Sequence, residues 1–148
     1  MPRFEFRLQK YLSVKEQIED QKEIEYATAL RQVEEEKARL AELESRKENT
    51  VQELRKSVAK SIAPIVIRRY NNNIERLKHL ILVQKERLEA AKMYAEEKRL
   101  ELVEAMKERK AIEKVKENAF EEYTVQEDRI TRRTTDELTS YKYATMQS

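Results

Sequence analysis

The sequence contains no cysteine, no tryptophan and no glycine, and it has only two prolines in 148 residues. Without cysteine it has no disulfide framework, thiolate zinc site or thiol nucleophile. Without glycine it lacks the P-loop and the GxGxxG dinucleotide turn, because both need backbone conformations or close approaches that a Cβ obstructs. The single histidine, His79, cannot form a histidine cluster, and the numerous Glu pairs have no water-excluding cleft. We therefore expect no cofactor, no metal, no catalytic residue and no enzymatic activity.

Long apolar runs are also missing. The longest, at residues 62–67, contains Pro64 and is far shorter than the roughly 20 residues that span a bilayer. No charged-then-apolar signal segment opens the chain, so we expect a cytoplasmic protein without direct membrane insertion. Lys+Arg and Asp+Glu nearly balance at 31 and 29, and after Lys56 adjacent basic residues occur only as short pairs such as Arg68-Arg69 and Arg132-Arg133. We expect no nucleic-acid binding, which usually needs basic residues gathered on one face.

What the sequence does contain is helix-forming residues in a heptad pattern. Charged residues make up 41% of the chain, and Glu, Lys, Arg, Leu and Ala are abundant. From Ile67 to Ile130, alternating steps of three and four land mostly on apolar residues or Tyr, the pattern of a coiled-coil seam. A less regular seam runs from Tyr26 through Leu30 to Ser61. An earlier frame, Phe4, Leu8, Tyr11, Lys15 and Ile18, implies a phase shift near Lys22.

The only punctuation in mid-chain is Pro64, which suits the first turn of a helix but not its interior. We predict an all-α protein, a single antiparallel coiled-coil hairpin over residues 1–148. Helix 1 covers about residues 4–60, the turn 61–64 and helix 2 about 64–140. Such a hairpin pairs position i with about 125 minus i. That register brings Phe4 and Phe6 close to Ala119, Phe120 and Tyr123. The last 15 to 25 residues, rich in Thr, then have no partner in the hairpin and are expected to protrude or be disordered.

The stretch from Ile62 to Val83 has more apolar residues than one narrow seam can bury. An exposed apolar excess near the turn indicates a protein-binding patch, and burial by self-association is the alternative.

The opening of the chain resembles the FliJ family of flagellar export proteins. The residues that carry the resemblance are FEFRLQKYL at 4–12, Lys15-Glu16 and Glu19-Asp20-Gln21, together with the order of an aromatic N-terminus, a long helix, a short break and an aromatic-led second helix. The resemblance implies a non-enzymatic part of the type III export apparatus, with a fold similar to the central stalk of rotary ATPases. It also implies three partners: the export ATPase (a FliI-like hexamer), the cytoplasmic domain of the export gate (FlhA-like), and export chaperones.

The resemblance further implies two sets of binding residues. The gate-binding set on helix 2, at four-three-four spacing, is Tyr70, Ile74, Leu77 and Ile81, and its companions on helix 1 are Leu40, Leu43 and Lys47. The stalk end that enters the ATPase ring comprises Phe4, Phe6, Leu8, Tyr11, Ala119, Phe120 and Tyr123.

The gate-binding set on helix 2 coincides with the predicted seam, so it cannot be both wholly buried and exposed for docking. Either the hairpin splays near its turn, or Leu80 and Val83 supply the seam while the Tyr70 set faces outward; we expect partial exposure. We expect the hairpin to be a monomer in isolation, and the resemblance implies peripheral association with the inner-membrane export apparatus. Two alternatives remain: the stalk counterpart of an injectisome, and a homodimeric coiled coil that acts as a spacer or tether.

Overall fold

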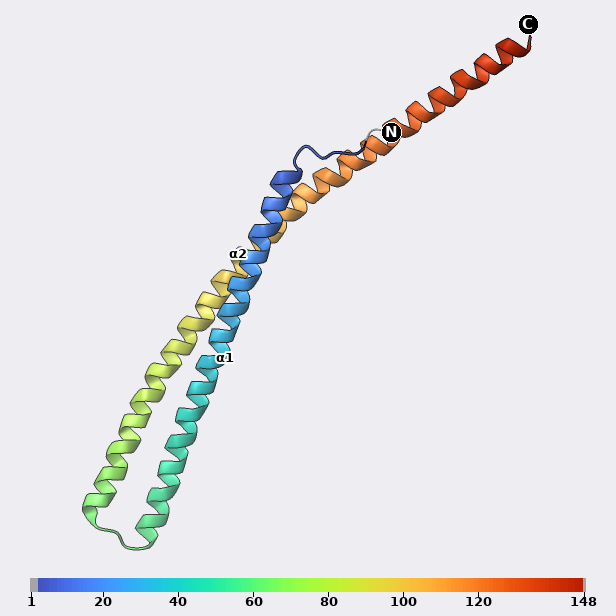
Figure 1. Ribbon diagram of the computed structural model, residues 1–148. Coiled ribbons are helices and arrows are strands. Elements are labelled where there is room, and N and C mark those ends of the chain that lie inside the picture. Colours follow the sequence, from blue (N-terminus) through green and yellow to red (C-terminus); the bar gives the residue numbers. More distant parts are fainter. Residues whose placement is uncertain (1–2, 148) are drawn as a thin grey trace. The chain divides into compact units, whose positions relative to one another are not determined.

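The computed structural model describes residues 3–147 and consists of two long helices, α1 (Gln9–Ala59) and α2 (Pro64–Met146) (Figure 1). The described residues contain no strand, and the two helices pair antiparallel, so the predicted fold class is confirmed. Residues 1, 2 and 148, which the predicted hairpin includes, lie outside the described residues. The chain forms two compact units. One comprises residues 21–103, which include the turn, and the other combines the residues up to Asp20 with those from Glu104 onward.

The turn is built without glycine. The last amide groups of α1 donate to carbonyls three residues back, from Lys60 to Ser57 and from Ser61 to Val58. Ser61 itself adopts a left-handed backbone with φ of 59°, which reverses the chain direction. Pro64 then occupies the first helical position, where its missing N–H costs no hydrogen bond.

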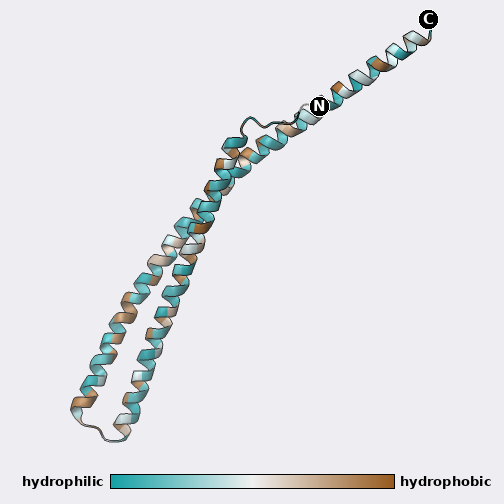
Figure 2. Cartoon of the chain, in the orientation of Figure 1, coloured by the Kyte–Doolittle hydropathy of each residue, from teal (hydrophilic) through white to brown (hydrophobic). Residues whose placement is uncertain are grey.

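The seam of α2 follows the predicted heptad. Every heptad position from Ile67 to Tyr123 is buried or half-buried, whereas Gln126 and Ile130 are exposed. In the unit formed by residues 21–103, a core of small and branched side chains from both helices packs together; its members are Ala29, Val33, Leu88 and Ala95, with Leu40 and Ala91 at its margin. Figure 2 shows that hydrophobic residues recur at intervals along helices that are otherwise hydrophilic.

The seam of α1 differs from the prediction. Its buried and half-buried residues follow one unbroken heptad from Leu12 to Ser57 with no phase shift near Lys22. Tyr11, Ile18, Leu30 and Val58, which the apolar pattern placed in the seam, are 38–52% exposed. The heptad instead buries polar residues such as Glu19 and Glu36, because α2 supplies hydrogen-bonding partners for them.

Helix 1 also begins later than predicted, at Gln9 rather than near Phe4. Residues 3–8 precede the helix and alternate strictly, with Arg3, Glu5 and Arg7 exposed and Phe4, Phe6 and Leu8 half-buried. Over residues 3–6 this period of two is that of an extended chain, in which successive side chains point to opposite sides, and Arg7 and Leu8 form the turn that leads into α1. An extended segment can turn both Phe4 and Phe6 toward α2, which a helix cannot do with residues two apart.

Helix α2 continues past the predicted end at about residue 140 and ends at Met146. All residues from 128 to 147 are exposed. Threonine hydroxyls in this stretch donate to carbonyls of the preceding turn: Thr134 donates to the Ile130 carbonyl and Thr135 to the Thr131 carbonyl, both at 2.9 Å. These bonds satisfy the hydroxyls within the helix, so the weak propensity of Thr does not end it.

Neither helix contains a stretch long and apolar enough to cross a bilayer within the residues that are described.

Candidate functional site

The predicted stalk end contains an aromatic cluster formed by Phe4, Phe120 and Tyr123. The ring centroids of Phe4 and Phe120 lie 5.2 Å apart in an edge-to-face arrangement, and those of Phe4 and Tyr123 lie 5.3 Å apart. Phe120 and Tyr123 are 6.4 Å apart. These separations are within the range in which aromatic rings attract one another beyond their simple burial. The cluster fastens the extended N-terminal segment to α2, and Phe120 stays 51% exposed.

The remaining residues of the predicted stalk end divide into two groups. Phe6, Leu8 and Ala119 are half-buried beside the cluster, and the ammonium of Lys116 lies 6.0 Å from the Phe6 ring centroid. Tyr11 does not join them, because it lies outside the α1 heptad and is 48% exposed. Its ring contacts the ammonium of Lys15 at 5.1 Å instead.

Ion pairs between α1 and α2 set the register next to this cluster. Lys15 Nζ donates to Glu108 Oε2 at 2.9 Å, and that hydrogen bond raises the pKa of Lys15 above its ordinary value. The guanidinium of Arg109 pairs with Glu19 across the helices and with Glu113 on its own helix at 2.8 Å. Both carboxylates raise the pKa of Arg109, with Glu19 as the larger cause. Such pairs add little energy where water reaches them, but only one register satisfies all of them.

The predicted gate-binding set on α2 lies mostly within the seam. Ile74, Leu77 and Ile81 are 4–9% exposed, and only Tyr70 is half-buried. Leu80 and Val83 are half-buried at the edges of the seam and do not replace the Tyr70 set in it. The expected partial exposure therefore applies to Tyr70 alone, because heptad spacing turns the other three residues toward α1.

The companion set on α1 faces the same seam. Leu40, Leu43 and Lys47 are all half-buried at heptad positions. Gln84 Nε2 donates to the Glu36 carbonyl at 3.1 Å, which fixes the register of this part of the hairpin. Heptad steps from that pair place Leu40, Leu43 and Lys47 opposite Ile81, Leu77 and Ile74. The structure thus brings the two predicted gate-binding sets together, facing each other.

The apolar residues near the turn that remain open to solvent are different ones. Ile65 and Leu82 are each 59% exposed, and Ile62, Val66 and Ile67 are half-buried. The apolar excess between Ile62 and Val83 signalled such a surface in the sequence, but only the heptad register decides which of its members face water.

Two polar layers escaped prediction because their residues are charged or amide-bearing. Glu36 receives hydrogen bonds from Gln84 across the seam and from Gln32 and Arg39 on its own helix, the latter two at 3.0 Å. Further along, Lys22, Glu25, Lys98 and Glu101 form a four-membered charge network between the helices. For the charge network a signal was present in the sequence, since the pairing rule of the hairpin sets Glu25 near Lys98 and Glu101. For Glu36 the rule points to position 89, five residues from its observed partner Gln84.

Residues 3–147 contain no group of three or more side chains able to hold a metal ion, and no buried side-chain nitrogen or oxygen among them lacks a hydrogen bond. His79 is exposed, as its place outside the seam predicts.

Comparison with known proteins agrees with this geometry. The sequence matches the family described as Flagellar FliJ protein over residues 4–148. Among solved structures, the fold is similar to that of CT670 from Chlamydia trachomatis, described as a YscO homolog, with a TM-score of 0.67 and 21% sequence identity over 98% of each chain. No curated protein matches the sequence.

Proposed function

The chain belongs to the FliJ family of flagellar proteins, which relates it to flagellar and type III export, and from this premise we propose its specific role. It is a non-enzymatic, cytoplasmic component of the flagellar type III export apparatus, associated peripherally with the inner membrane. It acts as the stalk of the export ATPase ring and links that ring to the export gate and to export chaperones.

The observation that carries the stalk role is the aromatic cluster of Phe4, Phe120 and Tyr123. It ties the start of the chain to α2, and beyond it α2 continues to Met146 as a single helix with no covering segment. All side chains from residue 128 to 147 face solvent. A paired base that continues as one exposed helix suits insertion into the central opening of a ring.

The stalk role is tested with the cognate export ATPase, by measuring ring assembly and turnover with and without the purified chain. We expect the chain to promote assembly and to change turnover, and we expect the double variant Phe4→Ala/Phe120→Ala to lose both effects. Tyr94→Ala is the matched control, because Tyr94 is an aromatic residue of similar exposure, 52%, in the other unit. If the unmodified chain affects neither assembly nor turnover, the stalk role is wrong.

For the gate, we propose a docking surface near the turn that includes Ile65 and Leu82 and the half-buried Tyr70. A partner that lies along α2 would cover these exposed apolar side chains, and replacing them leaves the seam intact. We expect Ile65→Ser/Leu82→Ser to weaken binding to the gate domain while helicity, followed by circular dichroism, stays unchanged. Leu100→Ser, at a residue 55% exposed and far along α2 from the turn, should leave binding unchanged.

The original gate-binding set is tested in the same assay with Tyr70→Ala and Leu77→Ala. Because Leu77 is only 4% exposed, its truncation is expected to lower stability. Docking through Leu77 requires the helices to separate locally. If Leu77→Ala loses helicity without a specific binding defect, Leu77 serves the seam alone.

A further inference from the structure

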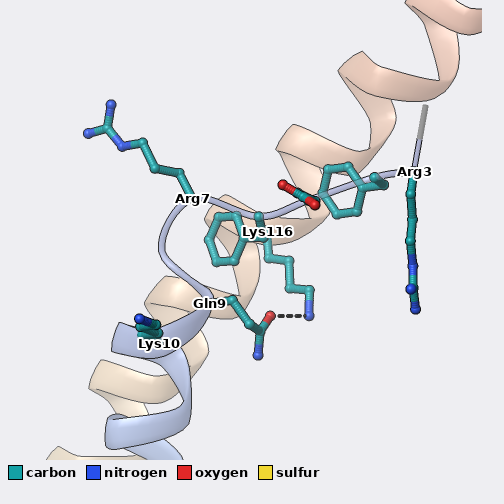
Figure 3. Close-up of a pocket in the computed structure, with 8 residues that line it drawn as sticks. Arg3, Arg7, Gln9, Lys10 and Lys116 are labelled. Carbon is teal, nitrogen blue, oxygen red and sulfur yellow. Dashed lines mark hydrogen bonds between the residues drawn. The ribbon is translucent and has the colours of Figure 1, made fainter.

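A shallow groove lined by four cations lies where the extended N-terminal segment meets α2. Its lining comprises Arg3, Phe4, Glu5, Phe6, Arg7, Gln9, Lys10 and Lys116. Figure 3 shows the side chains of Arg3, Arg7, Lys10 and Lys116 arranged around this segment, with Lys116 reaching Gln9. The sequence does not reveal this cluster, because Lys116 lies more than a hundred positions after the other three cations.

These cations lack ion-pair partners among the described residues. Throughout residues 3–147, no carboxylate forms an ion pair with Arg3, Arg7 or Lys10, although Glu5 lines the same groove. Lys116 donates to the neutral amide oxygen of Gln9 at 2.7 Å. Nearby cations of the same unit behave differently, since Lys15 and Arg109 are both paired with glutamates. The lining therefore holds four cations and one carboxylate, and this net positive charge attracts an anionic partner.

We infer that this groove binds a carboxylate-rich segment of a partner protein. The basic residues form one local cluster rather than the long stripe typical of nucleic-acid binders. A membrane surface would need aromatic side chains free to insert, whereas Phe4 packs on Phe120 and Tyr123 and Phe6 lies beside Lys116. Arginine forks match carboxylates bidentately, and the neighbouring rings offer apolar surface to the methylenes of glutamates.

The inference does not depend on the stalk role, since an acidic segment of any partner would bind by the same contacts. If the chain fails to assemble the ATPase ring, the inference about the groove is unaffected, because the experiment below contains no ATPase.

The test uses the full-length chain and a labelled hexaglutamate peptide, with hexaglutamine as the neutral comparison. Amide resonances of the chain, followed by nuclear magnetic resonance, locate the contacts. The variant Arg3→Gln/Arg7→Gln/Lys10→Gln removes three cations of the groove. The matched control Arg31→Gln/Arg55→Gln/Lys56→Gln removes three exposed cations from the other unit.

We expect hexaglutamate to shift the resonances of residues 3–10 and 116, and hexaglutamine to shift none of them. The groove variant should bind about tenfold more weakly, as the loss of three exposed charge pairs implies, and the control variant should bind normally. Equal weakening in both variants, or shifts spread over all lysines and arginines, would overturn the inference. So would tighter, groove-dependent binding to single-stranded DNA or to vesicles that contain phosphatidylserine.

Discussion

Glu36 and Gln84 occupy seam positions that an apolar residue normally takes, and each is only 5% exposed. They tolerate burial because Gln84 donates both to the Glu36 carbonyl and to its carboxylate, while Gln32 and Arg39 satisfy the other carboxylate oxygen. A buried polar pair adds little net stability compared with an apolar pair, but a slipped register would leave it unpaired. We interpret this layer as a device that fixes register.

Replacing Gln84 by Ala tests this interpretation. The variant removes the donor from α2 and leaves Glu36 with fewer partners, so we expect it to lose about 1–3 kcal/mol of unfolding free energy. The measurement is urea denaturation followed by circular dichroism.

The double variant Glu36→Leu/Gln84→Leu is the comparison, because it replaces both polar groups and leaves neither unpaired. It should be as stable as the natural chain or more so. A double variant that is less stable than Gln84→Ala would contradict the proposed role of the pair.

The backbone of Ser61 is also unusual, because it is left-handed at a residue that is not glycine. A Cβ in this conformation costs about 1 kcal/mol, so Ser61→Gly should raise stability by a similar amount and the melting temperature by about 2–4 °C. Ala38→Gly is the control, since Ala38 is exposed in the interior of α1 and glycine there should cost about 0.5–1 kcal/mol. Thermal denaturation of the two variants should shift in opposite directions, and shifts of the same sign would contradict the turn geometry.

At the scale of elements, the sequence predicted α2 better than α1. The seam positions of α2 are mostly apolar or aromatic, so the repeat could be read directly. In α1 the true seam includes Lys22, Glu19 and Glu36, while exposed Ile18 and Leu30 suggested another frame. Hydropathy identifies a seam only where the partner helix offers apolar surface; where it offers counter-charges, the seam is polar.

The charge network between the helices makes stability depend on pH. Hydrogen bonds from Lys22 to Glu25 and from Lys98 to Glu101 hold the pKa values of both carboxyls below their ordinary value of 4.5. Groups with a lowered folded pKa contribute stability above the ordinary value, and that contribution is lost as pH falls through the folded value. Glu25→Gln/Glu101→Gln should therefore lower the melting temperature near neutral pH and have no effect in strong acid.

The control for this experiment is Glu75→Gln/Glu89→Gln, which removes two carboxylates that pair only within α2, with Lys78 and Lys92. Its effect should be smaller, because isolated pairs along an exposed helix add little. High salt should reduce the difference between the network variant and the natural chain. An equal effect of the two double variants would show that the network between the helices has no special role.

At the scale of the whole molecule, each helix satisfies its seam with the other helix of the same chain. The predicted register holds at the start of α1, where Gln9 contacts Lys116, and it drifts toward the turn: Lys15 contacts Glu108, and Glu36 contacts Gln84 instead of the predicted Glu89. Because the partner is covalently attached, pairing carries no dependence on concentration.

We therefore predict a monomer of 17.8 kDa by light scattering, with a melting temperature that does not change with protein concentration. A homodimeric spacer, the structural alternative, would show twice this mass and a melting temperature that rises with concentration. A doubled mass, or a melting temperature that rises with concentration, would contradict the intramolecular hairpin.

The sequence by itself determined that the chain forms two helices, where they turn and that they run antiparallel. Helix propensity is local, the break at Pro64 is local, and a short connection leaves only an antiparallel partner. The tertiary structure decided which side chains are free to act. It buried Ile74, Leu77 and Ile81, left Ile65 and Leu82 exposed, and gathered Lys116 with three cations of the N-terminal segment. Exposure and charge clustering depend on what the opposing element presents at each level, and residues distant in sequence meet only when the hairpin has formed.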